Sequence, residues 1–246
     1  MNSMRASALE IISQTADEAA VFKPAGLSCE RAAGDRGDSL LQRARAALHW
    51  DDCQLPHRLD RPTRGVMMIA RDRAVVAHHC EEIRQGAWEK WYFARIPLRA
   101  RDVDAHTLVG EHRAYLKREG KLARVVRSGG DPSRLTVLGV AATRDPTHDP
   151  THDPTHDSSR EAHALIRLDT GRFHQIRVML ASLGFPLIGD DAYGGEGWPD
   201  GFDLESVALR IKRAQGDLVF RLPVHAARHG VAPELEATLT QILSAR

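Results

Sequence analysis

The chain mixes two periods of hydrophobic residues, one typical of strands and one typical of helices. Apolar runs and period-two alternation predict strands at residues 18–28, 66–70, 88–96, 135–141 and 162–168. The first strand is short, because Pro24 and Gly26 turn the chain directly after its apolar residues. The third is rich in aromatic residues, and its period places Lys90 and Tyr92 on one face.

Apolar residues three and four positions apart predict three helices. One covers residues 40–48, with Asp38 or Ser39 as its N-cap. A second begins after the capping residue Asp72 and ends at Gly86. The third follows a glycine turn in the segment LDTGRFHQIRVMLASLG. Its predicted buried stripe, which Gly184 ends, consists of Ile176, Met179, Leu180 and Leu183.

The order of these elements indicates the fold class. Strands outnumber helices and do not alternate strictly with them, which favours an α+β fold with a mixed sheet over a doubly wound parallel fold. A chain of 246 residues with 42% hydrophobic content can bury a large core, so we expect residues 1–246 to form a single domain. Residues 144–160 contain the repeat DPTHDPTHDPTHD, whose prolines predict an exposed low-complexity insertion between two strands.

Composition narrows the possible classes of function. The formal net charge of +1 gives no overall attraction to nucleic acid, so any RNA contact must come from a local basic cluster. The chain contains no run of about 18 apolar residues and no export signal, which predicts a soluble, cytoplasmic protein without membrane contact. Cys29, Cys53 and Cys80 lack CxxC spacing, and histidines in a proline-rich repeat bind metal weakly. We therefore expect neither disulfides nor a metal site.

Four short motifs lie between about residues 19 and 195. They read VFKPAGL, HRLDRPTRGVMMIAR, EKWYF and LDTGRFHQIRVMLASLGFPLIGDDAYGG. In order and rough spacing they resemble the RluA-type RNA pseudouridine synthase family, in its short form. The resemblance implies a largely antiparallel central sheet flanked by helices. It also implies that the protein isomerises a uridine in structured RNA to pseudouridine.

By this resemblance Asp60, in the HRLD motif, is the catalytic aspartate that attacks the target uridine or its sugar. A carboxylate can act as a nucleophile and then in proton transfer, so no cofactor is expected. Arg177 matches the family arginine that pairs with this aspartate, and an adjacent guanidinium favours the ionised carboxylate. From spacing alone, a loop aspartate is more often a helix cap or a surface group.

Four other residues are predicted to contact the RNA. Tyr92 matches a tyrosine that stacks on the flipped base and assists a proton transfer, while Lys90 would approach the RNA backbone. Arg58 corresponds to an arginine that inserts where the target base leaves. His174 lies three residues before Arg177, so we expect both on one side of the same helix, facing the RNA.

The sequence departs from the family pattern in places. Arg64 replaces a usual serine, Met179 replaces a frequent histidine, and the segment after Gly195 keeps only the pair His225-Ala226. The changes at Arg64 and Met179 concern substrate specificity and leave the catalytic groups in place. With 17 residues before the strand predicted to begin at residue 18, we expect no separate RNA-binding module, and we expect a monomer without an obligatory protein partner. The RNA is expected to be tRNA or rRNA, with HRLDRPT somewhat closer to the transfer-RNA branch.

Two alternatives remain open from the sequence. A non-catalytic RNA-binding or RNA-chaperone protein that retained the fold is favoured by Arg64 and by the poorly matching C-terminal part. A metal-dependent hydrolase built on the histidine repeat is the other. Replacing Asp60 by asparagine separates the first alternative from the enzyme, because only the enzyme depends on that carboxylate.

Overall fold

The computed structural model describes residues 9–31, 37–100, 103–143, 161–195, 203–223 and 230–245. The chain forms two compact units, each built from two separate stretches of sequence. Unit 1 comprises Met1–Trp88 and Ser206–His225, and unit 2 comprises Glu89–Glu205 and Ala226–Arg246. The repeat at residues 144–160 and the pair His225-Ala226 lie outside the described residues. The expectation of one catalytic domain stays a prediction.

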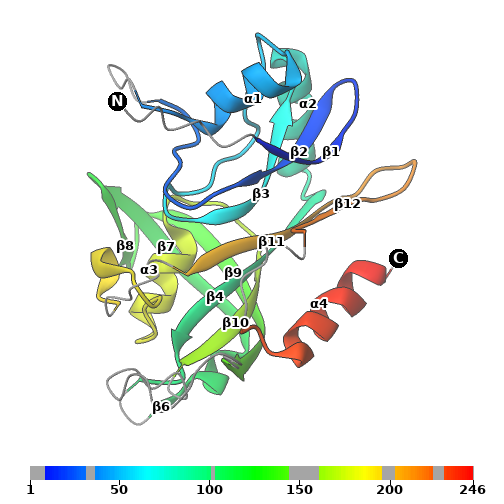
Figure 1. The fold of residues 1–246 in the computed structure, drawn as a ribbon. Coiled ribbons are helices and arrows are strands. Elements are labelled where there is room, and N and C mark those ends of the chain that lie inside the picture. The colour runs from blue at the N-terminus through cyan, green and yellow to red at the C-terminus, as the bar shows by residue number, and fades with distance from the viewer. Residues whose placement is uncertain are drawn as a thin grey trace, which may run out of the picture. The chain divides into compact units, whose positions relative to one another are not determined.

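Unit 1 combines a sheet with two helices (Figure 1). Its elements are β1 (Glu10–Gln14), β2 (Glu18–Lys23), α1 (Leu40–Leu48), β3 (Arg64–Ala70), α2 (Arg73–Arg84), β11 (Leu204–Ile211) and β12 (Leu218–Arg221). The strand order is β1, β2, β3, β11, with β12 paired to β11. Strand β2 pairs antiparallel with both β1 and β3, and β11 pairs antiparallel with β12. The central strand β3 is buried from Gly65 to Ala70, as its continuous apolar run predicts.

Local capping signals set the ends of both helices in unit 1. The Ser39 side chain accepts a hydrogen bond from the Gln42 backbone N–H at 3.2 Å, so Ser39 is the N-cap of α1. Asp72 caps α2 by accepting from the backbone N–H groups of Ala74 and Val75 at 2.9 and 3.1 Å. The predicted helix at residues 40–48 and the predicted Asp72 cap are therefore confirmed.

Unit 2 contains a five-stranded antiparallel sheet in the order β4, β10, β9, β7, β8. Its elements are β4 (Trp88–Pro97), β5 (Arg99–Ala100), β6 (Val103–Asp104), η1 (Ala105–Leu108), β7 (Gly110–Glu119), β8 (Leu122–Val126), β9 (Asp131–Ala142), β10 (Glu161–Leu168), α3 (Gln175–Ser182), η3 (Asp191–Tyr193) and α4 (Pro233–Ser244). Ala142 of β9 lies opposite Ala162 of β10. The two strands that flank the repeat are therefore antiparallel neighbours in the sheet.

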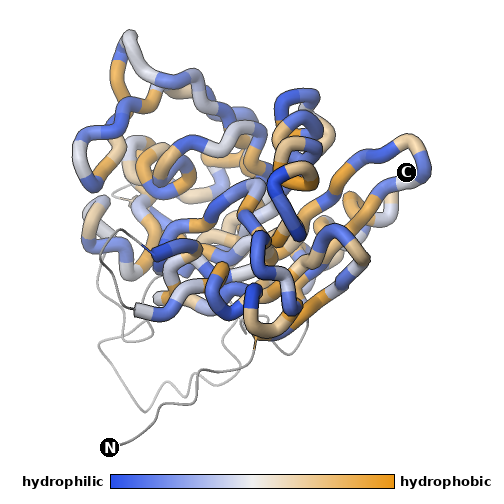
Figure 2. Tube along the Cα trace, turned by 90° about the horizontal axis from the view of Figure 1, so that it is seen from above, coloured by the Kyte–Doolittle hydropathy of each residue, from blue (hydrophilic) through white to orange (hydrophobic). Residues whose placement is uncertain are grey.

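The predicted α+β class is confirmed, and the apolar runs form the cores of the units. Figure 2 shows hydrophobic and hydrophilic residues alternating along the trace. One expectation about the third helix is wrong. Ile176, Met179 and Leu180 are buried, but Leu183 is 41% exposed because it is the C-cap of α3 and has left the helical face. Within the described ranges, no helix is long and apolar enough to cross a membrane.

Gly65, the second residue of β3, occupies a position that needs glycine. Its φ is +122°, in a region that residues with a side chain rarely adopt. A Cβ atom placed there would lie 2.2 Å from the carbonyl oxygen of Ser206 on β11. The neighbouring strands can approach each other this closely only because position 65 has no side chain.

We expect Gly65→Ala to lower the free energy of unfolding by about 3 kcal/mol or more, because it combines backbone strain with a clash against backbone. Gly216→Ala is the matched control, since Gly216 has φ +121° but nothing lies within 4 Å of its would-be Cβ. We expect the control to cost roughly 1 kcal/mol. Urea unfolding of both variants measures the difference, and equal losses would contradict this explanation.

Candidate active site

The HRLD loop, defined here as residues 55–63, connects the region after α1 to β3 in unit 1. Its start is tied to the sheet, and its end is closed by a turn. Before the loop, Gln54 exchanges two backbone hydrogen bonds of 2.9 Å with Ala70, the last residue of β3. At its far end, the Thr63 N–H donates to the Asp60 carbonyl at 3.1 Å, which closes a turn around Asp60. The Asp60 side chain is half-buried on this tied loop.

Lys23, at the end of β2, holds the same turn from inside. Its side chain is completely buried, and its ammonium group donates to the carbonyls of Pro24, Arg61 and Thr63. Burial lowers the pKa of Lys23 to about 8, and the nearby Asp60 carboxylate offsets part of that shift. Two hydrogen bonds also link Gly26 and Arg61. The Gly26 backbone N–H donates to the Arg61 carbonyl, and the Arg61 Nε–H donates to the Gly26 carbonyl, each at 2.8 Å.

Sequence reasoning gave Lys23 no role, although it lies in the motif VFKPAGL. A signal was present, because a lysine that ends an apolar strand needs acceptors when it is buried. Which acceptors it finds depends on residues about 40 positions away. Only the folded chain identifies them.

Arg58 and His57 lie at the start of the loop and differ in exposure. The Arg58 side chain is 73% exposed, with Glu30 at 3.7 Å, so this ion pair is weak. His57 instead accepts a hydrogen bond from the Met68 backbone N–H at 3.1 Å, and its ring lies edge-on to Trp88 at 5.3 Å. The loop therefore presents a solvated arginine beside a histidine that is anchored to the sheet.

In unit 2, Arg177 of α3 forms a buried bidentate ion pair with Asp190. Its Nε and Nη2 atoms donate to the two carboxylate oxygens, each at 2.8 Å, and both side chains are less than a tenth exposed. The guanidinium also lies 4.9 Å from the centre of the Tyr193 ring. Such a pair fixes the orientation of Arg177. Sequence reasoning did not assign Asp190, although it lies in the GDD part of the last motif.

The predicted pairing of Arg177 with Asp60 stays a prediction, because these residues belong to different units. Within unit 2, Asp190 is the carboxylate that orients Arg177.

Tyr92 and Lys90 lie on β4, two residues apart and on one face as predicted. Tyr92 is buried, 4% exposed, and lies opposite Ile166 of β10. Burial lowers the pKa of Lys90 to about 8. Its ammonium nitrogen lies 4.0 Å from the position that a Cβ of Gly171 would take. The Lys90 ammonium group therefore lies beside the glycine turn that precedes α3.

His174 lies in a different place from the one predicted. Its φ of +56° is left-handed, so it is the N-cap of α3 and not part of the helical face of Arg177. Its Nδ1 atom is hydrogen-bonded to the Tyr193 hydroxyl at 2.9 Å, and its ring stacks on Phe173 at 3.8 Å. The hydroxyl of Tyr193 also accepts from the Ala123 N–H at 2.8 Å. The Tyr193 ring thus contacts both His174 and Arg177.

Gln175 stabilises the turn that precedes α3. Its side-chain oxygen accepts from the Arg172 N–H at 3.0 Å and from the Thr170 hydroxyl at 2.8 Å. Its side-chain NH₂ donates to the Arg134 carbonyl on β9 at 2.9 Å. The glutamine of the HQIR motif is therefore a structural residue that ties the glycine turn to the sheet.

Each unit carries some of the groups that carboxylate chemistry on a nucleoside uses. Unit 1 contains a carboxylate on a tied loop, with a buried ammonium behind it. Unit 2 contains an aromatic ring and two cationic side chains on its sheet and helix.

Comparisons with known proteins agree with the four motifs. The sequence model of the family described as RNA pseudouridylate synthase matches residues 19–182. Ribosomal large subunit pseudouridine synthase D of Pseudomonas aeruginosa is 30% identical over 198 residues, which cover 76% of this chain and 54% of that protein. An uncharacterized RNA pseudouridine synthase of Mycoplasma pneumoniae is 28% identical, covering 76% of this chain and 55% of its own length. The chain thus spans about half the length of these curated relatives.

Solved structures of human proteins share the fold. The structure of human RNA pseudouridylate synthase domain containing 1 superimposes with a TM-score of 0.68 at 18% identity, covering 96% of this chain and 95% of that one. Human RNA pseudouridylate synthase domain containing 4 gives a TM-score of 0.63 at 18% identity, covering 88% and 89% of the chains. At this identity the likeness concerns the fold alone.

The lowered pKa of Lys23 gives a pH-dependent prediction. Because the folded-state pKa of about 8 lies below the usual 10.5, the unfolded chain binds more protons between these values. Stability should therefore rise with pH in this window, by at most roughly 1.4 kcal/mol per pH unit. We expect the unfolding free energy of the unmodified protein, minus that of Lys23→Met, to increase by roughly 2 kcal/mol from pH 8 to pH 10. Urea unfolding at both pH values measures this difference, and a constant difference would contradict the buried charge.

Proposed function

Since this chain belongs to the RNA pseudouridylate synthase family, we propose that it converts a uridine of structured RNA to pseudouridine, with Asp60 as its catalytic carboxylate. The observation that carries the proposal is the HRLD loop itself. It lies within the matched residues 19–182, and hydrogen bonds to Lys23 and between Asp60 and Thr63 hold its turn. A carboxylate on a tied loop can attack without first ordering its own backbone.

The proposed reaction is an isomerisation. Asp60 attacks the target uridine or its sugar as the nucleophile, and the bond between uracil N1 and ribose C1′ breaks. The base turns, a bond forms between uracil C5 and ribose C1′, and the bond to Asp60 breaks, which returns the free carboxylate. The hydrogen at C5 leaves as a proton while N1 takes up a proton, and the side chain of Tyr92 is proposed to stack on the base and assist this transfer. Atoms and electrons balance without an oxidant or a reductant.

Cationic side chains are proposed to position the RNA and the carboxylate. Arg58 is largely solvent-exposed, so its planar cation is available to fill the space that the flipped base leaves. Lys90 is proposed to approach the RNA backbone, and His174 to contact the RNA beside it. Arg177, oriented by Asp190, is proposed to favour the ionised form of Asp60 during the reaction.

The choice of RNA is also a proposal. Several relatives are named large ribosomal subunit pseudouridine synthases, which makes large-subunit rRNA the first substrate to test. Bulk tRNA is the second, because the sequence of the HRLD loop is similar to the transfer-RNA branch of the family. Mapping pseudouridines in RNA from a strain without this gene distinguishes the two.

We expect Asp60→Asn to lower the rate of pseudouridine formation by at least about 1,000-fold, since removal of a catalytic nucleophile is among the most damaging active-site changes. The assay uses RNA labelled at uracil C5 with tritium, taken from a strain without this gene, and counts tritium released to water. Asp51→Asn, at an exposed aspartate nine positions earlier, is the matched control and should keep full activity. Full tritium release by Asp60→Asn would remove Asp60 from the catalytic role, whereas no release by the unmodified protein would favour the non-catalytic RNA-binding alternative.

RNA affinity should respond to different residues. We expect Arg58→Ala to weaken binding of the same RNA and to reduce the slope of log affinity against log salt by about 1, because it removes one cation. Asp60→Asn should bind the RNA with unchanged affinity. Filter binding over a series of salt concentrations measures both, and an unchanged affinity of Arg58→Ala would remove Arg58 from the interface.

A further inference from the structure

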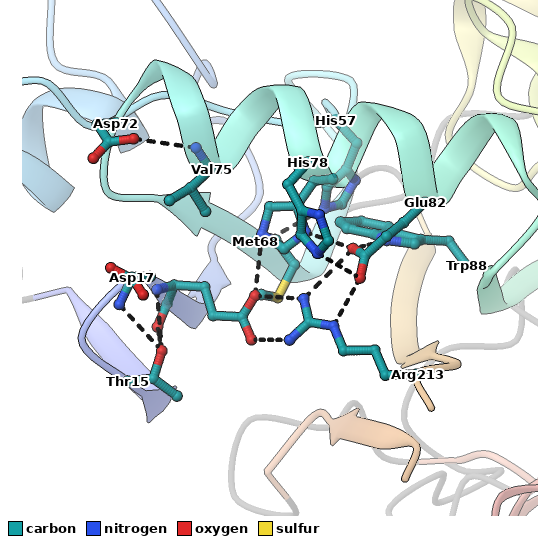
Figure 3. A network of polar contacts seen from close by, with 12 residues as sticks. Thr15, Asp17, His57, Met68, Asp72, Val75, His78, Glu82, Trp88 and Arg213 are labelled. Atoms are coloured by element: carbon teal, nitrogen blue, oxygen red, sulfur yellow. Dashed lines mark hydrogen bonds and ion pairs between the residues drawn. The ribbon is translucent and has the colours of Figure 1, made fainter. Parts of the chain in front are cut away.

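A buried ionic cluster joins three segments of unit 1 that are distant in sequence (Figure 3). It consists of Glu18 on β2, His79 and Glu82 on α2, and Arg213 between β11 and β12. Arg213 donates to both oxygens of Glu18, each at 2.8 Å, and to Oε1 of Glu82 at 2.7 Å. His79, completely buried, lies 2.9 Å from Glu82 and 3.1 Å from Glu18. Glu82 and Arg213 are 131 residues apart in the chain.

Both carboxylates of the cluster are held in the ionised form. Burial would raise their pKa values, but hydrogen bonds and ion pairs with Arg213 and His79 lower the pKa of Glu18 and of Glu82 to about 2. The same contacts raise the pKa of Arg213 above its usual range. Arg213 is therefore a permanent cation held by the carboxylates of Glu18 and Glu82, and its guanidinium group has little freedom to move.

The ionic cluster reaches the HRLD loop through two rings. The indole N–H of Trp88 donates to Glu82 Oε2 at 3.2 Å, the same oxygen that His79 contacts. Trp88 in turn contacts His57 of the HRLD loop. The two rings lie edge-on, with their centroids 5.3 Å apart and their planes at 74°. A backbone tie supports this arrangement, because the Lys212 N–H donates to the Ala87 carbonyl at 2.9 Å. Figure 3 shows Arg213, Glu82, Trp88 and His57 in this order.

His57 is three residues before Asp60, so its position affects where the carboxylate lies. Lys23 fixes the turn after Asp60, whereas His57 is the ring-anchored residue before it. The hydrogen bond from Met68 sets one side of the His57 ring, and the Trp88 ring sets another. Catalytic groups typically need such support, because a displacement of about 1 Å can lower a rate by about two orders of magnitude.

We infer that Arg213 is a positioning residue for the proposed reaction, acting on the HRLD loop through Glu82, Trp88 and His57. This inference rests on the proposed function of Asp60. It gives a role to the C-terminal part of the chain, which has little resemblance to the family in sequence. Arg213 does not need to touch the RNA in this role.

The test separates the rate of reaction from RNA binding. With enzyme in excess over the C5-tritiated RNA, the maximal rate constant reports the reaction step, and the half-saturating enzyme concentration reports binding. We expect Arg213→Met to lower the rate constant by about tenfold or more, with the half-saturating concentration changed by less than about threefold. Arg213→Lys should restore part of the rate, because it keeps a cation between the two glutamates.

Chemical rescue adds a second readout. Arg213 lines a cleft of about 600 Å³ together with side chains of β1, α2 and β12, so small solutes can reach its position. We expect millimolar guanidinium to raise the rate constant of Arg213→Ala and to leave that of Asp60→Asn unchanged, since the added cation can replace only the missing guanidinium group of Arg213.

Arg210→Met is the matched control. Arg210 is a buried arginine on β11 that pairs with Asp217 at 3.7 Å, so this variant removes a similar side chain from the same hairpin. We expect Arg210→Met to keep the rate constant within about twofold, even if its melting temperature falls as far as that of Arg213→Met. Fluorine NMR of protein labelled with 5-fluorotryptophan should show the Trp88 signal, assigned with Trp88→Phe, shifted in Arg213→Met and unshifted in Arg210→Met.

The outcomes distinguish the inference from the proposed function. A folded Arg213→Met that keeps its rate constant, or an equal loss in Arg210→Met, overturns the role of Arg213. Should the Arg213 variants fail to fold, Trp88→Phe decides, because it removes the five-membered ring with its N–H and keeps a six-membered aromatic ring beside His57. An unchanged rate then overturns the inference. Full activity of Asp60→Asn instead overturns the proposed function, while the Trp88 signal still reports whether Arg213 positions the ring.

Discussion

A buried ammonium group constrains the HRLD loop more than any other single group. Lys23 has no exposed surface, and its charge is compatible with burial only because three backbone carbonyls accept its hydrogen bonds. Two of those carbonyls, of Arg61 and Thr63, belong to the turn that follows Asp60. The turn must therefore point both carbonyls at one nitrogen, which leaves the backbone around Asp60 few conformations.

Strand β2 supports the loop from two directions. Lys23, at its end, lies under the turn, while Glu18, at its start, belongs to the ionic cluster with Arg213. In both places a buried charged side chain is paired with partners of fixed position. The hydrogen bonds and ion pairs that form in this way also hold the backbone of the partner residues in place. Unit 2 follows the same rule, since Arg177 is oriented by Asp190. Polar groups inside this protein thus set positions, while the apolar strands supply most of the buried surface.

Elements whose signals are local were predicted correctly from the sequence. Ser39 and Asp72 cap their helices through hydrogen bonds that span only two or three residues. Pro24 ends β2, and the apolar run of β3 is buried as expected. The motif around Asp60 likewise needed only neighbouring residues to be recognised. The strands β7 and β8 escaped prediction, because their residues are largely exposed and show no clear apolar alternation.

The sequence by itself therefore determined the starts of α1 and α2, the buried strands β2, β3, β4, β9 and β10, and the motif that contains Asp60. The buried strand β11 and helix α4 were not predicted. The tertiary structure decided which groups hold these pieces in place. It paired Arg177 with Asp190, joined Arg213 to Glu82 across 131 residues, and placed His174 outside the helix. The physical reason is range: caps and turns depend on atoms a few residues away, whereas a buried charge takes whichever partners the packed chain brings to it.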